Sequence, residues 1–284
     1  MKRIGIVGCG LMGSGIAEVT AGAGAQVIVI ESDDDALASG RERIDRSLAR
    51  AVSSAKMSDE DAAGIRANLT FSTNIADLAD REMVIEAIAE NEALKLDVFR
   101  RIDGAVADPN AILATNTSSI PIITVAMATT RPQQVVGMHF FNPVPVLRLV
   151  EVISSLRTSP ETTARTIEYA RDVLGKKVIT APDRAGFVVN ALLIPYLLSA
   201  IRMVEAGYAS AEDIDIGMVE GCAHPMGPLA LTDLIGLDTT LAVAQSLYDE
   251  FKEPHLAPPP LLSRMTAAGL LGRKSGEGFF SYRT

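Results

Sequence analysis

A glycine-rich turn near the N-terminus constrains the fold of this chain more than any other feature. The motif GCGLMG at residues 8–13 follows an apolar run at 3–7 and opens a stretch of small residues that extends to 23. A second run rich in Ile and Val follows at 26–31. Strand, tight turn, helix and strand in this order form a βαβ unit with parallel strands. The N-terminal sequence therefore predicts the first unit of a doubly wound α/β domain.

The spacing of the three glycines predicts a dinucleotide site in this turn. The first glycine permits the tight turn, the second lets the backbone approach a pyrophosphate, and the third lets helix and strand pack closely. The pyrophosphate then faces free N–H groups at the helix N-terminus. We expect the cofactor to contact Gly8, Gly10, Leu11, Met12 and Gly13.

Glu31 ends the second strand and indicates which cofactor binds. A carboxylate at this point accepts hydrogen bonds from ribose hydroxyls and repels a 2′-phosphate, so we expect NAD rather than NADP. Asp33, Asp34 and Asp35 follow, with no Lys or Arg close to them in the sequence. The alternative is that these acidic residues only solvate a loop and cap the next helix.

Hydrophobic periodicity divides the chain into two domains. Up to residue 184, apolar runs typical of strands alternate with helical patterns, and from 186 onward only helical patterns follow. We predict a Rossmann-type doubly wound sheet at 1–184, with an inserted helical hairpin at about 36–66, followed by an all-helical domain at 185–284. Further strands are expected at 68–73, 83–87, 111–114, 135–139, 149–152 and 177–180, and helices at 92–106, 160–174, 187–206, 210–221, 228–250 and 261–268.

A histidine and a glutamate lie on two apolar segments that a Pro-rich bend separates. His139 ends the segment 135–139, and Glu151 lies within the apolar run 149–153. Two neighbouring strands would let the imidazole meet the carboxylate. A buried Glu requires a partner, and a His held by a carboxylate is a common proton-transfer device. The pair predicts a catalytic base, and the alternative is a structural histidine.

Composition and charge argue against several classes of function. The net charge is −9 and no basic run is present, which argues against a nucleic-acid surface. The longest apolar stretch, 187–201, contains Asn190 and Pro195 and is too short to span a membrane. With two distant cysteines, no metal-ligand spacing and no leader before the first strand, we expect a cytoplasmic protein without a metal site. We interpret Cys9 as a small side chain that fills the glycine turn, not as a reactive thiol.

Eight short motifs occur in order over nearly the whole chain. They are GCGLMGSGIA at 8–17, EAIAEN at 86–91, TNTSS at 115–119, HFFNP at 139–143, GFVVN at 186–190, PMGP at 225–228, GLDT at 236–239 and GEGF at 276–279. With this series the chain resembles the L-3-hydroxyacyl-CoA dehydrogenase family, most closely the short bacterial 3-hydroxybutyryl-CoA dehydrogenases.

The resemblance implies an oxidoreductase that reversibly oxidises L-3-hydroxyacyl-CoA to 3-ketoacyl-CoA with NAD, with short-chain 3-hydroxybutyryl-CoA as the expected substrate. It implies that His139 is the catalytic base, Glu151 its partner, and Ser118 and Asn190 the residues that place the substrate. It also implies a substrate-binding and homodimerising role for the helical domain. Further cofactor contacts are implied at Glu90, Lys95, Asn142 and Lys274.

The chain departs from the family pattern where the CoA phosphates would bind. In relatives, a Ser and a Lys on the first hairpin helix hold these phosphates. Ser47 matches the first of them, but Ser54 occupies the lysine position, and Arg50 and Lys56 are the nearby basic residues. We expect Ser47, Arg50 and Lys56 to bind CoA, and the alternative is a solvated helix face.

Two other functions fit the same sequence. One is a dehydrogenase on this scaffold that acts on a free hydroxy acid or a sugar acid, which needs no CoA grip. The other is a catalytically idle NAD-binding structural protein. The combination of Ser118, His139, Glu151 and Asn190 argues against the idle protein, since a structural role does not require it.

Overall fold

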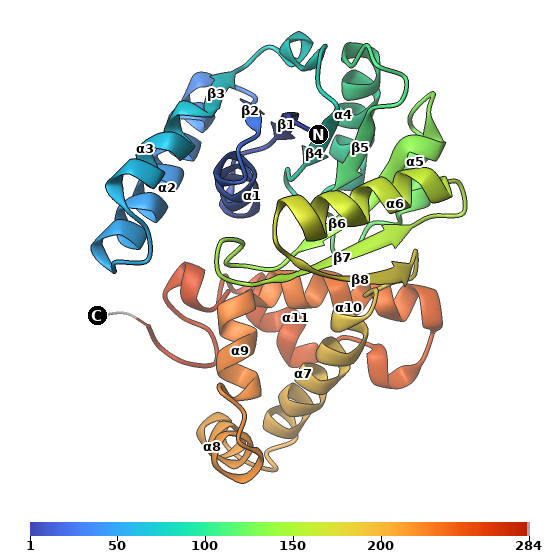
Figure 1. Ribbon diagram of the computed structural model, residues 1–284. Helices are drawn as coiled ribbons and strands as arrows, with labels where there is room; N and C mark the ends of the chain where they lie inside the picture. The colour runs from blue at the N-terminus through green and yellow to red at the C-terminus, as the bar shows by residue number, and fades with distance from the viewer. Residues whose placement is uncertain (283–284) are drawn as a thin grey trace. The chain divides into compact units, whose positions relative to one another are not determined.

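The computed structural model describes residues 1–282. The N-terminal part of the chain forms a single eight-stranded sheet (Figure 1). The strand order is β3-β2-β1-β4-β5-β6-β7-β8. Neighbouring strands are parallel except for β6 and β7, which are antiparallel. The strands are β1 (Arg3–Val7), β2 (Gln26–Ile30), β3 (Leu69–Ser72), β4 (Met83–Glu86), β5 (Ile112–Thr115), β6 (Val135–Phe140), β7 (Leu149–Ser154) and β8 (Lys177–Pro182). The doubly wound sheet predicted from the sequence is confirmed.

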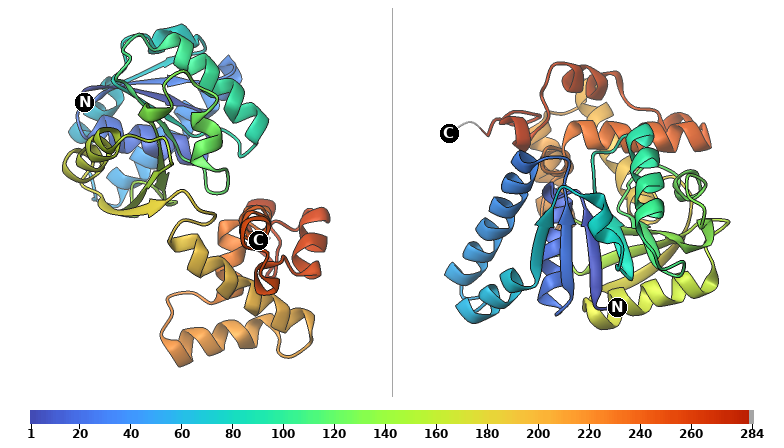
Figure 2. Two further views of the ribbon diagram at one scale, coloured as in Figure 1. Left: turned by 90° about the vertical axis from the view of Figure 1, so that its right-hand side faces the viewer. Right: turned by 90° about the horizontal axis from the view of Figure 1, so that it is seen from above.

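Helices cover both faces of this sheet (Figure 2). They are α1 (Leu11–Gly22), α2 (Asp34–Ser53), α3 (Asp59–Ala67), α4 (Glu92–Ala105), α5 (Ile122–Ala126) and α6 (Pro160–Glu168), with short 3₁₀ turns at Ile75–Leu78 and Pro132–Gln134. The expected helix at 160–174 is not α-helical throughout, because a π-helical turn, Tyr169–Val173, replaces its end. Close packing of α1 on the sheet depends on Gly13, where a Cβ would lie 1.9 Å from the Gly8 carbonyl oxygen.

Side chains at the helix starts define the hairpin α2–α3. Asp33 caps α2 by accepting a hydrogen bond from the Ala36 N–H at 2.8 Å. At α3, Ser58 and Asp61 form a capping box, in which each side chain accepts from the backbone N–H of the other. These polar caps explain why the two helices begin where the sequence pattern predicts.

The chain separates into two compact units, the second beginning at Arg184. The helices of this second unit are α7 (Val189–Glu205), α8 (Ala211–Cys222), α9 (Pro228–Ile235), α10 (Leu237–Phe251) and α11 (Pro260–Ala267), with 3₁₀ turns at Pro254–Leu256 and Arg273–Ser275. The prediction of one helix over 228–250 is wrong, because Gly236 has a φ of 102° and ends α9 before α10 begins. Among residues 1–282, no helix combines the length and hydropathy that crossing a membrane requires.

Candidate active site

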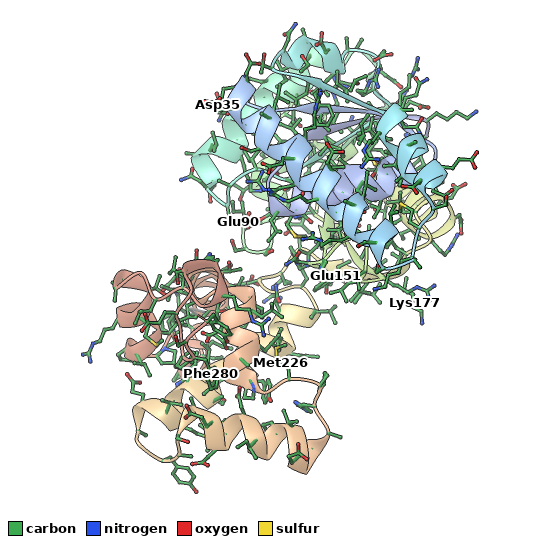
Figure 3. All side chains as sticks on the ribbon, turned by 90° about the vertical axis from the view of Figure 1, so that its left-hand side faces the viewer. Asp35, Glu90, Glu151, Lys177, Met226 and Phe280 are labelled. Carbon is green, nitrogen blue, oxygen red and sulfur yellow. The ribbon has the colours of Figure 1, made fainter. Side chains whose placement is uncertain are left out.

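The predicted His/Glu pair lies on two adjacent strands, one of them next to the edge strand β8. His139 of β6 and Glu151 of β7 are directly opposite each other in the antiparallel register. The Nδ1 atom of His139 is 2.7 Å from Oε2 of Glu151. His139 is 5% exposed and Glu151, which Figure 3 labels, is fully buried, so the contact is shielded from water. The β6–β7 register therefore fixes the spacing of the pair.

Ser118 extends this pair to a chain of three side chains. It lies in the loop after β5, and its Oγ is 3.1 Å from Nε2 of His139. With a proton on Nδ1 shared with Glu151, the Nε2 lone pair faces the Ser118 hydroxyl. Phe141 packs edge-on against the imidazole, with the ring centroids 4.6 Å apart. Because Nδ1 is held by Glu151, Nε2 is the imidazole atom that can exchange a proton with a bound molecule. It faces Ser118, which is half-exposed.

Glu90 positions the loop that carries Ser118. Its Oε1 accepts hydrogen bonds from the backbone N–H groups of Ser118 at 2.9 Å and Ser119 at 3.0 Å, and from the Thr117 hydroxyl. Burial alone would raise the pKa of Glu90, but the Lys95 ammonium and these hydrogen bonds outweigh it and lower the pKa. Glu90 therefore stays ionised at neutral pH and ties the loop after β4 to the loop after β5.

A buried ion pair beneath Glu90 escaped the sequence analysis. Glu86, at the end of β4, is fully buried and accepts from the Lys95 ammonium and the Thr115 hydroxyl, each at 2.7 Å. The Lys95 ammonium also lies 3.2 Å from Glu90. Lys95 is 1% exposed and sits between two carboxylates, so its cofactor contact stays a prediction. A glutamate within an apolar strand, the signal that identified Glu151, would have identified Glu86 as well.

The glycine turn borders a cavity of about 420 Å³ at the carboxyl ends of β1, β2 and β4. Glu31 lies at this cavity, where its carboxylate accepts from the Cys9 backbone N–H. Gly8, Gly10 and Glu31 share the cavity with the apolar side chains of Ile88, Leu94 and Val98. Apolar walls suit an adenine ring, and the carboxylate suits ribose hydroxyls, so the residues fit NAD. Leu11 and Met12 follow at the start of α1.

Two basic residues from other elements lie near Glu31 or the turn beside it. Arg101, on α4, lines the same cavity. Arg43, on α2, donates to the Cys9 carbonyl oxygen at 3.3 Å. Both come from other elements, and nothing in the residues around Glu31 indicates them. The carboxylate of Glu31 still occupies the position that disfavours a 2′-phosphate.

The three residues predicted to bind CoA lie on the hairpin α2–α3, and one of them lies next to a buried acid of α1. Ser47 of α2 is half-buried and lies next to Glu18 of α1, which is 4% exposed. Burial raises the pKa of Glu18, although the Ser47 hydroxyl and the Arg50 charge oppose the rise. Arg50 is exposed in the last turn of α2, and Lys56 lines an open hollow at the hairpin tip. The sequence analysis missed Glu18.

Three further predicted site residues lie on other elements of the chain. Asn142 is exposed immediately after β6, next to a cis peptide bond with Pro143. Asn190, in the first turn of α7, and Lys274, whose ammonium pairs with Asp238, belong to the second unit. Their predicted roles at the substrate and the cofactor stay predictions. No group of His, Cys, Asp and Glu suited to a metal ion occurs among residues 1–282.

Known families and proteins match this chain over its length. Residues 3–184 match the 3-hydroxyacyl-CoA dehydrogenase NAD binding domain, and residues 186–282 match the 3-hydroxyacyl-CoA dehydrogenase C-terminal domain. A 3-hydroxybutyryl-CoA dehydrogenase of Mycobacterium tuberculosis is 56% identical, with 99% of each chain covered. The crystal structure of M. tuberculosis FadB2 covers 100% of this chain and 99% of its own at a TM-score of 0.98 and 56% identity. That of (S)-3-hydroxybutyryl-CoA dehydrogenase PaaH1 from Ralstonia eutropha covers 100% of both chains at a TM-score of 0.94 and 45% identity.

Proposed function

Because this chain belongs to the 3-hydroxyacyl-CoA dehydrogenase family, we propose that it oxidises L-3-hydroxybutyryl-CoA to acetoacetyl-CoA with NAD⁺, reversibly. The observation that carries the proposal is the Ser118–His139–Glu151 chain, at 3.1 and 2.7 Å, in the same unit as the NAD cavity. A nucleotide site and a held imidazole are together what removal of a hydride and a proton from an alcohol requires.

In the oxidation, His139 takes the proton from the 3-hydroxyl group on its Nε2 atom. Glu151 holds the imidazole by its Nδ1–H and stabilises the imidazolium that forms, as a carboxylate does in a catalytic triad. When bound, NAD⁺ accepts the hydride from C3 of the substrate. The Ser118 hydroxyl donates a hydrogen bond to a substrate oxygen. Glu90 keeps the Ser118 loop in place. In the reverse direction, His139 returns the proton to the same oxygen.

The remaining predicted residues complete the binding sites in this proposal. Residues 1–184 bind NAD through the glycine turn and Glu31. Asn142, Glu90 and the buried Lys95, which pairs with Glu90, add further contacts. Residues 185–284 supply Asn190 to the substrate and Lys274 to the cofactor, and form the homodimer. Ser47, Arg50 and Lys56 hold the CoA phosphates on the hairpin.

The test is NADH consumption by the purified protein with acetoacetyl-CoA, compared with free acetoacetate and with NADPH. We expect rapid turnover only with the CoA ester and NADH. Turnover of free acetoacetate at a similar rate would favour the dehydrogenase of a free hydroxy acid. NADH binding without turnover of either substrate would favour the idle NAD-binding protein.

A further inference from the structure

A buried lysine lies beneath the loop that joins the two catalytic strands. Lys176 precedes β8 and is 7% exposed. Its ammonium donates to the carbonyl oxygens of Val144 at 2.6 Å and Leu147 at 2.8 Å. Within the described part of the chain it has no carboxylate partner, and burial, helped by the positive charge of Arg148, lowers its pKa. A buried ammonium held only by carbonyl groups is unusual, because burial of a charge is unfavourable.

The loop above Lys176 has few other anchors. Residues 141–148 connect β6, which carries His139, to β7, which carries Glu151. Val144 is the buried side chain of the stretch 143–148, and it packs close to Gly15, where a Cβ would lie 2.9 Å from the Val144 Cβ. Within the loop, the N–H groups of residues 146 and 147 donate to the Pro143 carbonyl oxygen at 3.0 and 2.9 Å.

We propose that Lys176 is a positioning residue whose ammonium clamps loop 141–148 and thereby sets the placement of Asn142 and of Phe141, which packs against the His139 imidazole. A lysine suits this task because its long stem carries three donors, which reach two carbonyl groups at once. Hydrogen bonds from a charged donor are stronger than neutral ones and offset the burial of the charge. The consequence for catalysis rests on the proposed function, whereas the consequence for loop order does not.

The test compares Lys176→Met with Lys176→Arg and with Lys177→Met as a matched control. Methionine keeps much of the stem but removes the donors. Lys177 is exposed, and its backbone N–H donates a hydrogen bond to the Arg148 carbonyl oxygen at 2.7 Å. Lys177→Met leaves this backbone hydrogen bond in place. The first readout is amide hydrogen exchange of residues 146 and 147. We expect exchange to accelerate about tenfold or more in Lys176→Met, with little change in the control.

The second readout is steady-state kinetics with acetoacetyl-CoA and NADH. We expect Lys176→Met to lower kcat about 10- to 100-fold because Phe141 no longer holds the His139 imidazole, and to raise the Kd for NADH about threefold because Asn142 is one of several proposed cofactor contacts. Lys176→Arg should recover part of kcat. Unchanged loop exchange, or unchanged kcat despite faster exchange, would overturn the proposal. So would a parallel loss of kcat, NADH affinity and helical circular dichroism, which indicates general unfolding. A wild-type protein inactive on acetoacetyl-CoA would refute the proposed function, and loop exchange would still decide the clamp.

Discussion

At the scale of single residues, burial makes the His139–Glu151 contact chemically useful. A carboxylate that is fully buried is unfavourable unless it is hydrogen-bonded, and the imidazole supplies that bond at 2.7 Å. The same bond fixes which ring nitrogen faces Ser118. One interaction therefore stabilises the acid and orients the proposed base.

Replacement of the proposed base should separate catalysis from cofactor binding. We expect His139→Gln to lower kcat about 10²- to 10⁴-fold, because glutamine cannot accept the proton. The Kd for NADH, measured by fluorescence, should be nearly unchanged. His255→Gln, at an exposed position, is the control and should retain full activity. Loss of NADH affinity with normal turnover would contradict the role assigned to His139.

The two cysteines should differ sharply in reactivity. Cys9 is fully buried, and burial raises its pKa to about 12. The Glu31 carboxylate adds to this rise in pKa, and the positive charge of Arg43 opposes it. Cys222 is exposed. Because the thiolate is the reactive form, a thiol reagent at pH 8 should modify one cysteine in the native protein and two after denaturation. Cys222→Ser should leave no fast-reacting thiol, and rapid labelling of that variant would refute the prediction.

At the scale of elements, the contact between α1 and α2 contains an acid that opposes folding at high pH. The pKa of Glu18 is raised in the folded protein, chiefly by burial, so the folded state retains a proton that the unfolded chain releases. Stability should therefore fall as pH rises from the unfolded value, about 4.3, through the folded pKa.

Glu18→Gln removes this titration and keeps an oxygen beside the Ser47 hydroxyl. We expect the difference in Tm, variant minus wild type, to be larger at pH 8 than at pH 4, as measured by scanning calorimetry. Glu42→Gln, on the exposed face of α2 with a side chain 65% exposed, is the control and should show little change of that difference. Parallel Tm profiles for Glu18→Gln and wild type would show that Glu18 does not titrate as proposed.

At the scale of the whole molecule, exposed apolar side chains of the second unit support the proposed homodimer. Leu192 on α7 is 75% exposed and Ile216 on α8 is 59% exposed. Large exposed apolar side chains occur at association sites, where a partner covers them.

A charge on this surface should dissociate the dimer. We expect wild-type protein to sediment as a dimer at micromolar concentration, and Leu192→Glu or Ile216→Glu to sediment as monomers because a carboxylate at an apolar interface is poorly solvated. Leu156→Glu, at a position 95% exposed in the first unit, should remain dimeric. A monomeric wild-type protein would contradict the proposal.

The sequence by itself determined the elements and the local chemistry. Runs of Ile and Val, the glycine turn and the polar helix caps act over a few residues, so the sheet, its hairpin and the position of Glu31 could be predicted from neighbours along the chain. The His139–Glu151 pair was also within reach, because only a bend separates the two apolar segments.

Only the tertiary structure decided which distant residues meet. Glu86 and Lys95 come together through the packing of α4 on the sheet, and Arg101 reaches the cavity of Glu31 from the same helix. Lys176, just before β8, reaches the loop between β6 and β7. None of these contacts has a repeating signature in the sequence, because strand order and helix packing create them. Burial, which lowers the pKa of Lys176 and raises that of Glu18, is a property of the folded chain alone.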